Sequence, residues 1–190
     1  MKKLTLNALA LAGLLAASTV AHAVPVPTLA GPLDNNTSFN AVVNSTGGSS
    51  SISFDLLGYS SLDGVNCCTD TFTLSLNGNT LLSGSYNLGG GGTNVTYTNP
   101  LNFVLTGLNP DPNFYGFGAL SSISITGLFN LLSGVNTLNF AYAGGAQGLG
   151  DEGWGVKNLN VSPVPLPPAA FLLATGILGL AGLRRRKAKA

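Results

Sequence analysis

Two adjacent cysteines, Cys67 and Cys68 in the stretch VNCCTD, are the side chains best suited to covalent chemistry, and the chain has no others. The amino-terminal residues, described below, predict export into an oxidising compartment, where free thiols seldom persist. Three outcomes are open: a vicinal disulfide, a pair of reduced structural thiols, or cross-links between chains. Because adjacent Cα atoms lie only about 3.8 Å apart, a vicinal disulfide closes a strained and more easily reduced ring.

Other catalytic side chains are scarce. The single histidine, His22, precedes the predicted signal-cleavage site, so the mature chain lacks the base of Ser-His and Cys-His pairs and the commonest zinc ligand. There is no Gly-x-Ser-x-Gly motif. A glycosidase needs two facing carboxylates roughly 5–10 Å apart, and the spacing of the seven acidic residues indicates no such pair. We therefore expect no catalytic residues and no enzymatic activity.

The central part of the chain predicts the elements that hold these side chains. Apolar and polar residues alternate, as in antiparallel strands with one buried face, in 51–57, 71–77, 93–99, 121–127 and 136–142. Further strand-like runs lie near 39–43, 81–87, 102–105 and 154–161. The stretch 77–79, NGN, predicts a hairpin turn, and the glycine run 89–92 predicts a flexible connector. We expect an all-β domain over 24–162, an antiparallel β-sandwich with a jelly-roll-like arrangement.

The amino-terminal residues 1–23 predict a secretory signal peptide. Lys2 and Lys3 form a positive start, an apolar helix-forming stretch follows, and Ala21 and Ala23 flank His22 in a small-x-small cleavage site. The secretion translocon and signal peptidase are therefore expected partners, and Val24 is the expected mature amino terminus.

The carboxy-terminal residues 163–190 predict a membrane anchor. Residues 169–183 form an uncharged and mostly apolar run, which as a helix spans roughly 22 Å, somewhat short of a hydrocarbon core of about 30 Å. Arg184, Arg185 and Arg186 follow directly, and such a cluster stays on the cytoplasmic side. We expect a transmembrane helix in the inner membrane that holds the central domain outside the cytoplasm.

The charges are segregated along the chain. All seven acidic residues lie between Asp34 and Glu152, and Lys157 is the only basic residue in the central domain, which leaves that domain with a formal charge of about −6. An acidic domain of this kind repels phosphate backbones, so nucleic-acid binding is excluded.

Residues 162–188, SPVPLPPAAFLLATGILGLAGLRRRKA, resemble the PEP-CTERM sorting signal, the substrate tail of exosortases. The resemblance rests on a proline turn, a short glycine-containing span and a terminal arginine cluster in that order. Leu166 stands where the Pro-Glu-Pro form has its acid, in a Val-Pro-Leu-Pro variant that is common in the family. The signal residues are Val164, Pro165, Leu166, Pro167, Gly176, Gly179, Arg184, Arg185 and Arg186.

The resemblance implies a Gram-negative exported protein. An exosortase would cut the tail near the proline turn, after a transient stage in which the protein is anchored in the inner membrane with its ectodomain in the periplasm. The body would then reach the cell surface or the extracellular matrix. Proteins with this tail generally accompany exopolysaccharide and biofilm loci, so extracellular polysaccharide is a further expected partner.

Residues 151–161, DEGWGVKNLNV, resemble the closing strand of many PEP-CTERM ectodomains and of jelly-roll, lectin-like modules. The resemblance implies a core position for Trp154 and a cation site formed by Asp151, Glu152 and Asn158. Oxygen ligands favour Ca²⁺ over transition metals. Since adjacent strand residues point to opposite faces, the two acids can ligate together only from a loop. The alternative is that they are solvated turn residues and that the protein binds no cofactor.

Together these features predict an exported, exosortase-processed protein of the cell surface or matrix with a non-catalytic binding or structural role near exopolysaccharide. Two alternatives stay open: a carbohydrate-active hydrolase of the cell envelope, and a self-assembling adhesive subunit.

Overall fold

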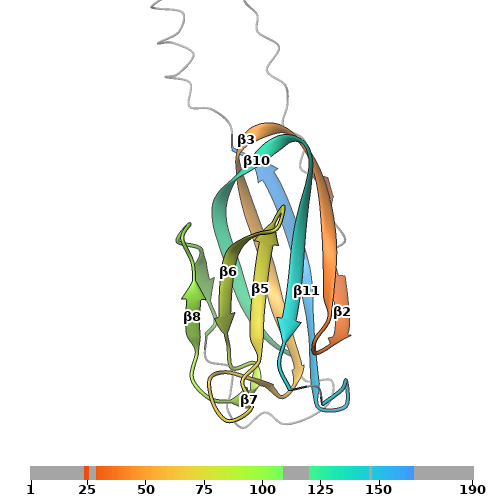
Figure 1. Cartoon of the computed structure of the whole chain (residues 1–190), viewed down its shortest axis with the longest axis vertical. Coiled ribbons are helices and arrows are strands. Elements are labelled where there is room, and N and C mark those ends of the chain that lie inside the picture. The colour runs from red at the N-terminus through yellow and green to blue at the C-terminus, as the bar shows by residue number, and fades with distance from the viewer. Residues whose placement is uncertain (1–23, 26–28, 109–119, 146, 165–190) are drawn as a thin grey trace, which may run out of the picture.

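The fold is described from a computed structural model over residues 24–25, 29–108, 120–145 and 147–164 (Figure 1). In these ranges the regular structure is all strand, and the sheet that carries the core is antiparallel, which confirms the predicted all-β, antiparallel class. Within the same ranges, no helix has the length and apolar character needed to cross a membrane. The predicted signal helix (1–23) and transmembrane helix (169–183) lie outside the described residues.

Nine strands form one sheet. Its main order is β1-β11-β3-β10-β5-β6-β8, with β2 added to β11 and β9 added to β10, while β4 and β7 form a separate parallel pair. The bounds are β1 Val24–Pro25, β2 Leu29–Asp34, β3 Ser38–Ser60, β4 Leu62–Asp63, β5 Thr71–Leu76, β6 Asn79–Ser85, β7 Gly89–Gly91, β8 Val95–Thr98, β9 Val104–Thr106, β10 Leu120–Ala143 and β11 Glu152–Pro163.

Two long strands fold this sheet into two layers. β3 and β10 pair along almost their whole length, from Leu120 opposite Tyr59 to Ala141 opposite Ser38, and both bend over one end of the domain (Figure 1). Beyond the bend, the second half of β10 pairs with β5, whereas the second half of β3 pairs with β11. The stretches predicted separately at 39–43 and 51–57 are therefore one strand, as are those at 121–127 and 136–142.

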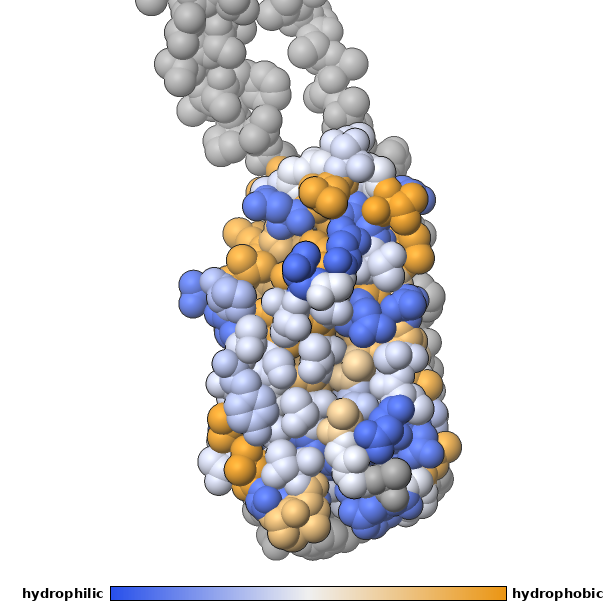
Figure 2. All heavy atoms as spheres, in the orientation of Figure 1, coloured by the Kyte–Doolittle hydropathy of each residue, from blue (hydrophilic) through white to orange (hydrophobic). Residues whose placement is uncertain are grey.

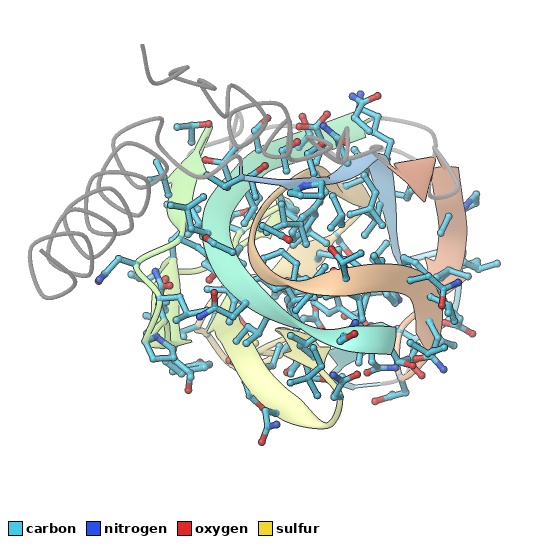
Figure 3. The ribbon with its side chains drawn as sticks, turned by 90° about the horizontal axis from the view of Figure 1, so that it is seen from above. Carbon is cyan, nitrogen blue, oxygen red and sulfur yellow. The ribbon has the colours of Figure 1, made fainter. Side chains whose placement is uncertain are left out.

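Alternation along the strands puts apolar side chains between the layers. In β5 every second residue is buried, and Figure 3 shows side chains filling the space that β3 and β10 enclose. Aromatic rings from β3, β10 and β11 pack together in the core: Phe39 stacks on Phe140 with centroids 4.9 Å apart, and Trp154 lies 5.6 Å from Tyr142. The largest fully buried side chains are Trp154, Tyr86, Tyr142, Phe54, Phe72, Phe140, Ile52, Leu56, Leu57, Leu62, Leu74 and Leu82.

One predicted turn is confirmed and one predicted connector is wrong. Asn77 and Gly78 join β5 to β6 with φ of 50° and 84°, the positive values that a two-residue hairpin turn requires. The glycine run 89–92, expected as a flexible connector, instead contributes β7, which pairs with β4. The physical reason is close approach: a Cβ on Gly90 would lie 2.1 Å from the carbonyl oxygen of Ser61.

The two flanks of the described domain leave it at the same end. Val24 pairs with Val161, and Pro163 lies opposite Ser50 near the bend of β3. The backbone N–H of Val164 donates to the carbonyl oxygen of Ser49 at 2.9 Å. Glu152 starts β11 at the opposite end of the domain, where β7 lies in Figure 1. At about 3.3 Å per residue, β11 places Glu152 about 35 Å from Pro163.

Candidate functional site

Three buried carboxylates meet at the end of the domain that is remote from Val164. Asp63 ends β4, Asp70 directly precedes β5, and Glu152 begins β11. One carboxylate oxygen from each of the three lies within 4.8 Å of the others. Asp70 and Glu152 are fully buried and Asp63 is 8% exposed. We call these three residues the acidic cluster.

Asn35, in the turn between β2 and β3, links two members of the acidic cluster. Its amide nitrogen donates to Asp70 Oδ1 at 2.6 Å and to Glu152 Oε2 at 2.7 Å. Its own carbonyl oxygen accepts from the backbone N–H of Asn36 at 2.8 Å, which orients the amide with its nitrogen toward the acids. Asn35 is itself 3% exposed, so these hydrogen bonds are shielded from water.

Neutral donors satisfy the remaining carboxylate oxygens in part. Asp70 Oδ2 accepts from the backbone N–H of Asp63 at 2.8 Å, and Glu152 Oε1 accepts from the amide of Gln147 at 2.8 Å. The amide of Asn66 donates to Asp63 Oδ1 at 2.8 Å. Each carboxylate is therefore held in a defined orientation by a neighbour that carries no charge.

The cysteine turn is attached to the acidic cluster through Asn66. The carbonyl oxygen of the Asn66 side chain accepts from the backbone N–H of Cys68 at 2.6 Å, while its amide holds Asp63. Cys67 and Cys68 are exposed thiols in this structure, and their sulfur atoms face each other at 2.7 Å. The predicted vicinal disulfide stays a prediction, and the turn that would carry it borders the site.

Glycines make room for two of the carboxylates. A Cβ on Gly144 would lie 1.9 Å from Asp70 Oδ1, and a Cβ on Gly90 would lie 2.5 Å from Asp63 Oδ1. The first strand residue after Asp70 pairs with Ala143, so Gly144 is the next position opposite Asp70. Only a residue without a side chain fits at these two positions while the carboxylates keep their places.

Burial dominates the electrostatics of the acidic cluster. It raises the pKa of Asp70 from the ordinary 3.8 to about 6, and the hydrogen bond from Asp63 N–H opposes that rise only in part. Burial also raises the pKa of Asp63 and of Glu152, and the nearby charge of Asp151 adds to both increases. Lys157, the only basic residue in the described part of the chain, lies five positions along β11 from Glu152, opposite Asp55.

The three residues expected to form a cation site do not converge. Glu152 belongs to the acidic cluster, but Asp151 is exposed and its carboxylate accepts from the Ser61 hydroxyl at 2.9 Å. Asn158 sits at an irregularity of β11 with φ of 54° and donates to Asp55 Oδ2 at 2.7 Å. Six residues of extended strand, about 20 Å, separate Asn158 from Glu152.

Trp154 has the core position that was expected of it. The indole is fully buried, and its N–H donates to the carbonyl oxygen of Asp34 at 3.0 Å and to the hydroxyl of Thr37 at 3.1 Å. Both acceptors flank Asn35 in sequence, so Trp154 fixes the turn that supplies the central amide of the site.

Most of the predicted sorting and cleavage residues lie outside the described residues. Val164 is described and is 40% exposed. Those outside are Ala21, Ala23, Pro165, Leu166, Pro167, Gly176, Gly179, Arg184, Arg185 and Arg186.

Comparison with known proteins assigns no family to the chain. No protein-family model matches it, and no curated protein matches it.

Sequence reasoning missed Asn35, Asp63 and Asp70 as site residues. A signal was present in the sequence, because Asp63 and Asp70 bracket the cysteine turn and the surrounding domain has almost no basic residue to pair with them. Buried acids without cations need another form of compensation.

Proposed function

We propose that this protein is an exported, exosortase-processed component of the cell surface or extracellular matrix, with a non-catalytic binding or structural role near exopolysaccharide. The proposal rests on the resemblance of residues 162–188 to a sorting signal, and the common end of the domain from which its flanks emerge supports it. A domain tethered through residues 165–168 would turn its bend toward the inner membrane and the acidic cluster away from it.

The bend itself suits a position next to a membrane. Leu132 and Val135, in the bend of β10, are 65% and 67% exposed. Figure 2 shows several apolar side chains on the visible face near this end of the domain. If the span begins at residue 169, five residues beyond Val164 allow at most about 17 Å between the domain and the bilayer. Apolar side chains on that end would then contact the headgroup region instead of bulk water.

The burial of the acidic cluster favours a structural role over hydrolysis. A glycosidase presents two carboxylates to a sugar in an open cleft. Here Asp70 and Glu152 are fully buried and share one amide donor, so neither faces an open cleft that could hold a sugar. For this reason we propose no catalytic role for either.

The edge strands favour display of single domains over edge-to-edge assembly. Among the described residues, β8 and β9 each pair on one side only, and they have four and three residues. β2, whose one partner in the same part of the chain is β11, carries Pro32, which cannot donate a backbone hydrogen bond. Short edges and edge prolines limit strand pairing between copies. We further propose that the two layers are a β-sandwich with jelly-roll-like connections.

The sorting part of the proposal is tested by following the full chain in a Gram-negative host with and without an exosortase. We expect the domain to leave the membrane fraction only when the exosortase is present, and to stay there when Arg184, Arg185 and Arg186 are replaced by alanine. Recovery of the full chain in the cytosol, with Met1 to Ala23 still attached, would overturn the proposal.

The role at the surface is tested on the host's own polysaccharide. Co-sedimentation of the released domain with the polysaccharide, with no new reducing ends formed, is the expected result. Release of sugars that is lost in Asp151→Ala or Glu152→Ala would favour the hydrolase alternative. Large assemblies in sedimentation velocity would favour the adhesive subunit.

A further inference from the structure

The acidic cluster has the spacing of a cation site. Two oxygens on opposite sides of a Ca²⁺ ion lie up to about 4.8 Å apart, because each Ca–O bond is about 2.4 Å long. The cluster oxygens of Asp63, Asp70 and Glu152 all lie within 4.8 Å of one another. One oxygen from each of the three carboxylates, with bound water completing the shell, gives the all-oxygen coordination that Ca²⁺ prefers.

The charge of the cluster has no partner in the described structure. The donors to its carboxylates are the neutral amides of Asn35, Asn66 and Gln147 and one backbone N–H. These groups orient the carboxylates but cannot neutralise them. Carboxylates that bind a metal ion are usually held in place by hydrogen bonds from neighbouring groups in the same way.

A second observation, independent of the acids, comes from Tyr142. Its hydroxyl is buried and has no hydrogen-bond partner among the described residues. Its ring packs 5.9 Å from Phe72 and 5.6 Å from Trp154, which are the next inward-facing residues after Asp70 and Glu152 on their strands. The ring of Tyr142 therefore lies in the core, in the layer of side chains next to the acidic cluster.

The field of the cluster reaches that hydroxyl. Burial raises the pKa of Tyr142 well above its ordinary value, and Asp70, Tyr86, Asp63 and Glu152 raise it further, in that order. A buried hydroxyl without a partner costs about 1–3 kcal/mol. A water molecule bound to a cation would donate a hydrogen bond to the Tyr142 oxygen.

We propose that Asp63, Asp70 and Glu152 together bind one Ca²⁺ ion, with Tyr142 facing a water of that ion. Because all the ligand atoms are oxygens, the site disfavours metals that prefer thiolate or imidazole ligands. Mg²⁺ keeps most of its waters and needs a near-ideal octahedron, so a largely buried set of carboxylates favours Ca²⁺. Asn35 is a positioning residue, since it holds two of the ligands through its amide nitrogen.

The proposed ion would join segments that are far apart in sequence. Asp63 and Asp70 frame the cysteine turn, and Glu152 lies more than 80 residues later at the start of β11. Because the ion binds the folded arrangement and not the separated segments, it stabilises the fold by mass action. This inference does not depend on the sorting signal.

The experiment uses the full chain in detergent, stripped with a chelator and then titrated with CaCl₂. We expect one ion per chain by calorimetry, with an affinity in the range of extracellular Ca²⁺ modules, about 10⁻⁴–10⁻³ M, and a rise in melting temperature that MgCl₂ at the same concentration does not reproduce. Terbium emission excited through the aromatic rings gives a second readout of the same site.

Matched variants separate this site from the other acids. Asp70→Asn and Glu152→Gln are each expected to weaken Ca²⁺ binding at least tenfold. Each variant loses one accepted hydrogen bond at its new amide NH₂ group but also removes a buried, unpaired charge, and because these effects offset each other both should still fold in the chelator. Asp151→Asn and Asp55→Asn keep the cluster intact and are expected to bind as the parent does. Tyr142→Phe removes the unpaired hydroxyl, so it should be more stable than the parent in the chelator and should gain less stability from Ca²⁺.

Two outcomes would overturn the proposal. One is a parent protein whose melting temperature and terbium emission do not respond to the ion. The other is binding that survives both Asp70→Asn and Glu152→Gln, or that disappears in Asp151→Asn, because the ion would then lie elsewhere.

Discussion

Asn35 donates a hydrogen bond of 2.7 Å to Glu152, a residue 117 positions further along the chain. The same amide nitrogen holds Asp70. This one side chain thus connects the turn after β2, the residue before β5 and the start of β11, and it does so without contributing charge.

Replacing Asn35 by alanine is expected to destabilise the protein. Two buried carboxylates lose a donor, and leaving buried charged acceptors unpaired costs about 2–4 kcal/mol in total. Urea unfolding followed by Trp154 fluorescence measures the change. Asn139→Ala is the control, since it removes an exposed amide hydrogen bond to Asn40, and it should change the stability by less than about 0.5 kcal/mol. Equal losses in the two variants would contradict the role given to Asn35.

Gly144→Ala is expected to lower both stability and Ca²⁺ affinity. The new Cβ would meet Asp70 Oδ1 at 1.9 Å, and that oxygen is held by Asn35 in a buried site, so accommodating the methyl group costs about 1–3 kcal/mol. Gly145→Ala is a close control because a Cβ there meets no atom within 4 Å. Melting curves of the two variants, with and without Ca²⁺, measure the difference. The prediction fails if Gly144→Ala behaves like Gly145→Ala.

The pH dependence of stability in the presence of a chelator follows from Asp70. In the folded protein its pKa is raised to about 6, whereas in the unfolded chain it is near 3.8. Between these values the folded state binds more protons than the unfolded state, so the contribution of Asp70 to stability is greatest below pH 4 and is lost as the pH rises to about 6.

Comparing the parent with Asp70→Asn between pH 4 and 7 isolates this contribution. The parent should lose stability relative to the variant over that window and then level off. Asp63 and Glu152 act in the same direction, because their pKa values are also raised. A relative gain of stability with rising pH would contradict the burial of Asp70.

If the protein is exported as we propose, it is expected to carry a vicinal disulfide. Cys67 and Cys68 already present their sulfur atoms to each other in a turn fixed by Asn66. Intact mass before and after reduction should differ by two hydrogen atoms, with monomers on a non-reducing gel. Disulfide-linked dimers would contradict the prediction.

If the thiols are reduced instead, Cys68 should be a poor nucleophile. The hydrogen bond with Cys67 raises the pKa of the Cys68 thiol to about 11, so little thiolate is present at neutral pH. Alkylation of Cys68 in the reduced protein at pH 7, located by peptide mapping, should therefore be slower than that of an unperturbed cysteine.

Local sequence patterns determined the class of the fold. Period-two alternation predicted strands such as β5 because it reflects only which face of each strand is buried. The turn at Asn77 and Gly78 could be predicted because asparagine and glycine tolerate the positive φ that it requires. The indole of Trp154 was assigned to the core, where it lies.

Tertiary structure alone decided which residues share a site. Alternation shows the buried face of a strand but not which strand ends meet, so Asn35, Asp63, Asp70 and Glu152 could not be brought together from their spacing. It also could not show that two predicted strands continue through a bend as β3, or that the run 89–92 lies against β4. These features depend on contacts between distant segments, and no local preference of the chain encodes such contacts.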